Sequence, residues 1–140
     1  MSSPLSIRFE PALLERLRRR AQATAGGSVS TLAQTLIDEG LRMAEHPGIA
    51  FKAGTSGRRA ALVNGPDVWE VVKFLHEVDE RGPAAVSAAA EVLGLPEARV
   101  HTAMRYFADY EAEIEAEIEA ADAASAAAEQ AWAAEQRLLA

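Results

Sequence analysis

The sequence contains no cysteine and no long apolar run, and each absence excludes a class of protein. Without cysteine among its 140 residues, the chain has no disulfide framework, no thiol nucleophile and no thiolate metal site. No segment approaches the roughly 20 apolar residues that a membrane-spanning helix needs. The first ten residues, MSSPLSIRFE, lack a basic region followed by an apolar stretch, so we expect a cytoplasmic protein.

Charge is divided unevenly along the chain. Residues 1–60 hold nine basic and five acidic residues, a net charge of plus 4, whereas residues 61–140 hold five basic and sixteen acidic, a net charge of minus 11. We therefore expect the N-terminal part to meet a polyanion and the C-terminal part to meet something basic. The length allows one ordinary domain or two very small ones and excludes a large enzyme scaffold.

Residues 1–46 are predicted to form one strand and two helices. Leu5, Ile7 and Phe9 alternate with polar residues, which is the period of a strand with one buried face. Pro11 suits the first turn of a helix that the glycines at 26 and 27 would end. A lone strand with two short helices cannot bury its apolar faces unaided, so we predict that this domain is an obligate dimer.

Residues 47–108 are predicted as a small β-hairpin followed by a helix-turn-helix-like module of three helices. Short apolar runs at 49–51 and 61–63 flank the glycine-rich basic connection KAGTSGRRA. Asp67 is expected to cap the first helix of the module, and further helices are predicted at 84–93 and from Glu97 onward. The predicted fold class is therefore mainly α.

Residues 109–140 are rich in alanine and glutamate, which are strong helix formers. If this helix is continuous from Glu97, it would be roughly 66 Å long. Its apolar residues lie along one side at spacings of three, four or seven: Tyr110, Ile114, Ile118, Ala121, Ala128, Trp132 and Leu139. We expect this acidic segment to bind a partner, and a coiled coil or packing within the chain is the alternative.

Two features of the N-terminal part are typical of proteins that bind nucleic acid. In a dimer, two strands would pair into a ribbon that enters a major groove with Ser6 and Arg8 directed at base edges. The second helix begins at Ser28, whose hydroxyl could clamp a phosphate together with the N–H groups of Val29 and Ser30. The simpler alternatives are an ordinary edge strand and a well-capped helix.

The stretches LSIRFEPALLERLRRRA and GGSVSTLAQTLIDEGLRMA, about residues 5–44, resemble the ribbon-helix-helix family of the Arc, MetJ and CopG type. This resemblance implies a homodimer that binds operator DNA. It also implies base contacts at Ser6 and Arg8 and phosphate contacts at Ser28, Val29 and Ser30.

A second resemblance covers about residues 46–118 and rests on the segments HPGI, PDVWEVV and PEARV. These segments look like a small antitoxin-associated domain, which implies an antitoxin of the VapB kind and a ribonuclease toxin of PIN-like fold as its partner. On the C-terminal helix, three apolar residues are expected to bury against the toxin and three carboxylates to pair with its cations. These residues are Ile114, Ile118 and Trp132, and Glu111, Glu115 and Glu119.

Catalytic patterns are missing from the sequence. His46, His76 and His101 are spread over different predicted elements, and neither HExxH, GxGxxG nor a phosphate-loop motif occurs. We therefore expect no enzyme, no metal and no cofactor. The function expected is an antitoxin that represses its own operon and neutralises a ribonuclease toxin. The alternatives are a regulator that has no toxin and a dimeric interaction protein that does not bind DNA.

Overall fold

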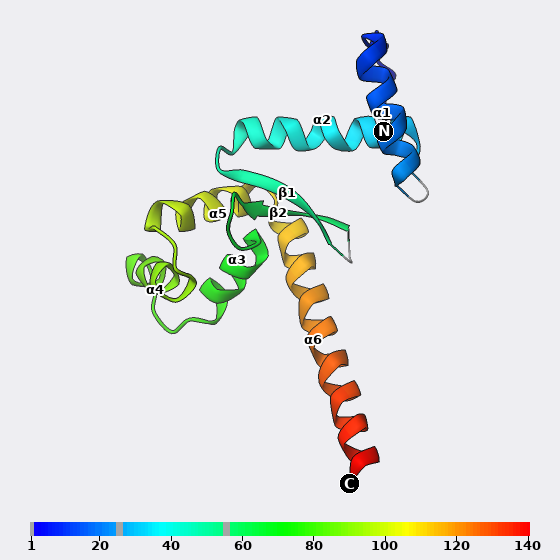
Figure 1. Ribbon diagram of the computed structural model, residues 1–140. Helices are drawn as coiled ribbons and strands as arrows, with labels where there is room; N and C mark the ends of the chain where they lie inside the picture. The colour runs from blue at the N-terminus through cyan, green and yellow to red at the C-terminus, as the bar shows by residue number, and fades with distance from the viewer. Residues whose placement is uncertain (1, 25–26, 55–56) are drawn as a thin grey trace. The chain divides into compact units, whose positions relative to one another are not determined.

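A computed structural model of the chain describes residues 2–24, 27–54 and 57–140 and is mainly helical (Figure 1). The elements follow the order α1 (Pro11–Ala23), α2 (Val29–Glu45), β1 (Ile49–Gly54), β2 (Gly57–Leu62), α3 (Val68–Glu77), α4 (Pro83–Leu93), α5 (Glu97–Asp109) and α6 (Glu111–Leu139). The predicted fold class, mainly α with one small β-hairpin, is confirmed. Each of these helices is too short or too polar to cross a membrane.

The chain forms two compact units, unit 1 (Met1–Arg42) and unit 2 (Met43–Ala140). Unit 1 contains α1 and most of α2, and unit 2 contains the hairpin and α3 to α6. The segment 109–140, which the sequence suggested as a separate part, thus lies in the same unit as the hairpin module.

Both helices of unit 1 begin where local signals place them. Pro11 stands in the first turn of α1, where its missing N–H costs nothing. At the start of α2 the Oγ of Ser28 accepts a hydrogen bond from the N–H of Thr31 at 3.0 Å, which is a standard helix cap. The helix predictions for residues 11 onward and 29 onward are confirmed. Gly26, one of the two glycines predicted to end the first helix, lies outside the described residues.

The strand predicted at residues 5–9 is not formed in a single chain. Among the described residues, positions 2–10 carry no strand assignment, and β1 and β2 pair with each other. A strand exists by hydrogen bonding to a neighbouring strand, and the ribbon was expected to pair with a second copy. The ribbon and the dimer therefore remain predictions.

The hairpin of unit 2 is longer than predicted. Its antiparallel register runs from the pair of Ile49 with Leu62 to the pair of Gly54 with Gly57. Most of the basic segment that was expected as a connection is therefore strand, and Lys52 lies directly opposite Arg59. Two residues of that segment, 55 and 56, lie outside the described residues. The longer strands therefore place two cations of the connection next to each other on adjacent strands.

One apolar core joins the hairpin to the four helices of unit 2. Its largest fully buried side chains come from β2, α3, α5 and α6: Leu62, Val68, Val71, Val100, Tyr106 and Ile114. Burying an aliphatic or aromatic side chain of this size stabilises a fold by about 1.5–3 kcal/mol. Unit 2 therefore has the core that a small independently folding unit needs.

The C-terminal helix is not continuous from Glu97. Tyr110 separates α5 from α6 with φ −134° and ψ 41°, and its N–H bonds to the carbonyls of both Tyr106 and Phe107 at 3.1 Å. The ring of Tyr110 packs on Tyr106 with centroids 4.6 Å apart. After this break, α6 alone has 29 residues, about 44 Å at 1.5 Å per residue. Figure 1 shows α6 extending well beyond the rest of unit 2.

Candidate nucleic-acid and partner interfaces

Unit 1 has almost no apolar core of its own. Ala21 is the one buried apolar side chain among its described residues. Large apolar side chains remain in contact with water, including Leu5 at 83% exposure and Ile7 at 51%. The predicted helix stripes are present, but a single chain provides nothing to cover them.

An open apolar groove of about 680 Å³ runs between the N-terminal segment and the two helices of unit 1. Residues of all three parts line it: Ser3, Pro4, Leu5, Ile7, Phe9, Leu17, Val29, Ser30, Ala33, Gln34 and Ile37. The apolar members of the predicted strand thus face the helices, while Ser6 and Arg8 are exposed and are not part of this lining. This is the division of side chains that the alternation predicted.

The predicted phosphate clamp at the start of α2 is partly engaged in capping. The Ser28 hydroxyl accepts the N–H of Thr31 and donates to the Oγ1 of Thr31 at 2.9 Å. The N–H groups of Val29 and Ser30 belong to the first turn, whose donors have no partner within the helix. An anion at this position would therefore meet two backbone donors and the positive end of the helix dipole.

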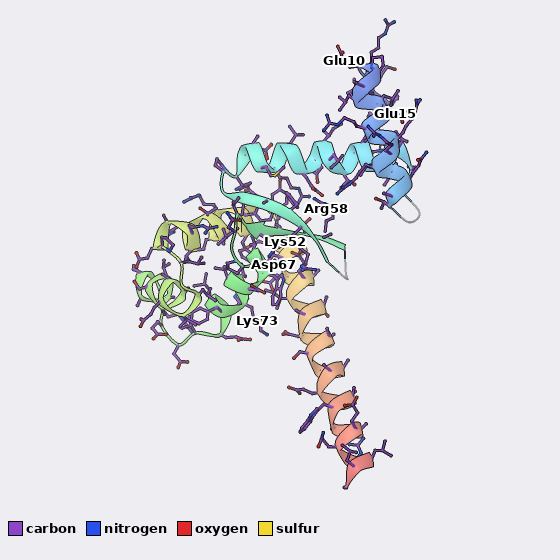
Figure 2. The ribbon with its side chains drawn as sticks, in the orientation of Figure 1. Glu10, Glu15, Lys52, Arg58, Asp67 and Lys73 are labelled. Carbon is purple, nitrogen blue, oxygen red and sulfur yellow. The ribbon has the colours of Figure 1, made fainter. Side chains whose placement is uncertain are left out.

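Unit 2 contains an ion cluster around Asp67 that no sequence pattern predicted; Figure 2 labels Lys52 and Asp67 of this cluster. Asp67 is buried, with 4% of its surface exposed. Its Oδ1 lies 2.9 Å from Lys52 Nζ, and its Oδ2 lies 2.7 Å from Arg59 Nε. The indole N–H of Trp69 donates to the same Oδ2 at 3.0 Å. The cluster joins both strands to the start of α3.

The sequence predicted that the side chain of Asp67 caps α3, and this prediction is wrong. Asp67 does precede α3, but its side chain makes no capping hydrogen bond. Instead it lies between Lys52 and Arg59, which face each other across the hairpin and would repel. Burial favours the neutral acid, yet hydrogen bonds from the two cations outweigh it and hold the pKa of Asp67 below its ordinary value.

Two of the histidines, His46 and His76, make structural contacts. His46 Nε2 lies 2.8 Å from Asp109 Oδ2, and its ring meets the edge of Tyr106 at 5.2 Å between centroids. His76 Nε2 lies 2.7 Å from Glu115 Oε1, which connects α3 to α6. Nowhere in the described ranges do three histidine or carboxylate side chains come together in a way that could hold a metal ion.

The residues predicted to bind a toxin fall into two groups in the structure. Ile114 and Ile118 are buried in the core of unit 2, at 0% and 8% exposure, so a partner cannot reach them while this unit is folded. Glu115 is held by His76. Trp132, in contrast, is 63% exposed, and Glu111 and Glu119 are exposed as well. The burial of the two isoleucines follows from the break at Tyr110, which sets α6 against α3.

The first part of α6 is anchored and the rest is not. Tyr106 Oη donates to Glu113 Oε2 at 3.1 Å, and Lys73 of α3, which is labelled in Figure 2, pairs with Asp122. Beyond Asp122, every residue of α6 is exposed except Ala133, which is partly covered. The surface available to a partner is therefore the final four or five turns of the helix, which carry Trp132 and Leu139.

A scan against protein-family models finds no match, and searches among curated proteins and solved structures find none either.

Proposed function

We propose that the chain is a cytoplasmic, non-enzymatic antitoxin that acts as a homodimer. In this proposal, unit 1 pairs with its copy to form a ribbon-helix-helix domain that binds operator DNA and represses the antitoxin's own operon. The exposed end of α6 binds a basic ribonuclease toxin of PIN-like fold.

The observation that carries the proposal is the missing core of unit 1. Two helices and an N-terminal segment leave an apolar groove open, and Leu5, Ile7 and Ile37 line it at 83%, 51% and 48% exposure. Paired strands from two protomers would satisfy the backbone of residues 5–9 and cover these side chains together. The same pairing would direct Ser6 and Arg8 away from the groove.

Base reading by Arg8 gives the first prediction. Arg8→Ala should weaken binding to the gene's own upstream DNA by about 1–3 kcal/mol, because a bidentate arginine contact to guanine is lost. Binding to a random duplex of the same length should change little. Fluorescence anisotropy at fixed salt measures both affinities.

A matched control for this variant is Arg18→Ala, which removes an equal charge from the exposed surface of α1. It should leave the preference for upstream DNA over random DNA unchanged. Equal affinity losses on both duplexes for Arg8→Ala would assign Arg8 to the phosphates and remove its base-reading role.

Toxin binding by α6 gives the second prediction. Deleting residues 123–140 should release the small basic nuclease encoded by an adjacent reading frame, because it removes Trp132 and leaves the core residues Ile114 and Ile118 in place. Trp132→Ala alone should raise the dissociation rate more than it lowers the association rate, since apolar burial governs the lifetime of a complex. Surface plasmon resonance separates the two rates.

Val92→Ala is the control, because Val92 is an apolar residue of α4 with 67% exposure. It should change neither rate. A complex of full strength after the deletion would move the toxin site to the hairpin and the helices α3 to α5.

Two other functions lead to different results in the same experiments. A regulator without a toxin would bind upstream DNA in a salt-dependent way, and its gene would have no neighbouring nuclease. A dimeric interaction protein would form the dimer but show no salt-dependent affinity for either duplex.

A further inference from the structure

The exposed face of α1 carries arginines that are not part of the proposed ribbon. Arg16, Arg19 and Arg20 surround a shallow hollow of about 310 Å³ whose floor includes Ala23. All three are exposed, and they lie three and four residues apart, so their side chains project from the same side of the helix. Arg18 lies on the other side, about 200° around the axis from Arg16.

These arginines have no carboxylate partner within the described chain. The ion pairs and hydrogen bonds of unit 1 involve other groups, such as the pair of Arg42 with Asp38. Glu15 lies four residues before Arg19 on the same helix, yet no ion pair joins them. Like charges at these spacings repel and destabilise a free helix. A ligand with several negative charges would relieve this repulsion.

We infer that Arg16, Arg19 and Arg20 form a second nucleic-acid contact, which binds phosphates of the duplex without reading its sequence. Along the axis of α1 the three residues cover about 6 Å, and over that length a DNA duplex carries about three to four phosphates. Guanidinium groups bind phosphate oxygens in a forked geometry. The charge density of the arginine face therefore matches that of a duplex.

An acidic protein segment is the other occupant that this surface could accept, and charge repulsion within that segment disfavours it. Carboxylates that match three arginines would have to stand three and four residues apart on one helix face, where they repel one another and destabilise the free segment, whereas a preformed duplex presents its charges about 1.7 Å apart along its axis. Three arginines within about 6 Å are therefore better neutralised by DNA. The inference rests on the proposed DNA binding of unit 1, and it adds a surface that the ribbon and the start of α2 do not include.

The test uses the full chain with Arg16→Gln, Arg19→Gln and Arg20→Gln combined, since glutamine keeps helix propensity and removes charge. Affinity for the upstream duplex and for a random duplex of equal length is measured by anisotropy over a salt series. Three lost phosphate contacts should reduce the slope of log K against log salt by about 2.7 for each protomer of the dimer that contacts the duplex. The loss of affinity between about 50 and 200 mM salt should shrink about fortyfold per protomer on both duplexes.

Two matched variants complete the test. Lysine at the same three positions should restore the slope, because it keeps the charge, and Arg18→Gln should leave the slope at the wild-type value. An unchanged slope in the triple glutamine variant overturns the inference and points to an acidic protein segment as the occupant. The inference is also overturned if Arg18→Gln alone reduces the slope as much as the triple glutamine variant does. The slope would then depend on the charge of unit 1 and not on where the arginines lie. If the wild-type chain binds neither duplex, the proposed function fails along with the inference.

Discussion

Phe9→Asp is expected to abolish both dimer formation and DNA binding. Phe9 is half-buried in the groove of unit 1, where the second protomer would complete its burial. A carboxylate placed in an apolar interface without a partner costs several kcal/mol, and a symmetric dimer contains two copies of it. The dissociation constant of the dimer should therefore rise by at least about a thousandfold. Sedimentation velocity over a concentration series measures this change.

Phe9→Leu is the matched control, because it keeps an apolar side chain at the same position. It should remain dimeric and bind upstream DNA with an affinity close to that of the wild type. A dimer that persists in Phe9→Asp would mean that residues 5–9 lie outside the interface, and the ribbon would then have to be abandoned.

The second large effect is expected from Asp67→Ala, which should destabilise unit 2 by about 3 kcal/mol. The change leaves Lys52 and Arg59 opposite each other without the carboxylate that separates them. The lower end of the range for broken buried ion pairs applies, because the side chain of Lys52 is 49% exposed and that of Arg59 24% exposed, so water solvates both in part. Urea unfolding followed by Trp69 fluorescence measures the loss, with both proteins carrying Trp132→Phe so that Trp69 is the one tryptophan.

The control for this measurement is Glu91→Ala, which removes an exposed carboxylate from α4. Its unfolding free energy should stay within about 0.5 kcal/mol of the parent. An Asp67→Ala protein as stable as Glu91→Ala would show that the cluster contributes nothing to folding.

The same cluster should make the stability of unit 2 depend on pH. The pKa of Asp67 is lower in the folded chain than in the unfolded chain, because Lys52 and Arg59 donate hydrogen bonds to its ionised form. Its contribution is therefore complete at neutral pH and is lost as the pH falls through the range below about 5. The difference in unfolding free energy between wild type and Asp67→Ala should shrink between about pH 6 and pH 3. A difference that stays constant over this range would contradict the charge mechanism.

The helices could be predicted from the sequence because their ends depend on local chemistry. Pro11 and Ser28 act within a single turn, and Gly94 ends α4 in the left-handed conformation, φ +67° and ψ 38°, that glycine adopts without strain. The break at Tyr110 has no such signal, since neither glycine nor proline marks it. It depends on how α5 and α6 pack, and packing between distant segments is not visible in a local pattern.

The candidate sites show the same division between local and long-range causes. The exposure of Arg8 follows from the alternation of residues 5–9, whereas the exposure of Trp132 does not follow from the helical period, because Trp132 shares its stripe with the buried Ile114 and Ile118. The role of Asp67 depends on the hairpin register, which places Lys52 opposite Arg59, and a shorter hairpin had been predicted. Likewise, Ile114 and Ile118 were assigned to a partner because their stripe continues to Trp132. The fold divides that stripe into a buried part and an exposed part.

In the proposed dimer, residues 5–9 of two protomers pair as an antiparallel ribbon. Because the chain has no cysteine of its own, single cysteines at Ser6, Ile7 and Arg8 can be introduced one at a time. Opposed residues of an antiparallel ribbon have Cα atoms about 4.5–5.5 Å apart, within the range of about 4.4–6.8 Å that a disulfide spans. We predict a disulfide-linked dimer for at least one of these variants under mild oxidation, and none for Ala84→Cys on α4. Chains that stay uncrosslinked at all three positions, as Ala84→Cys does, would contradict the ribbon and the account built on it.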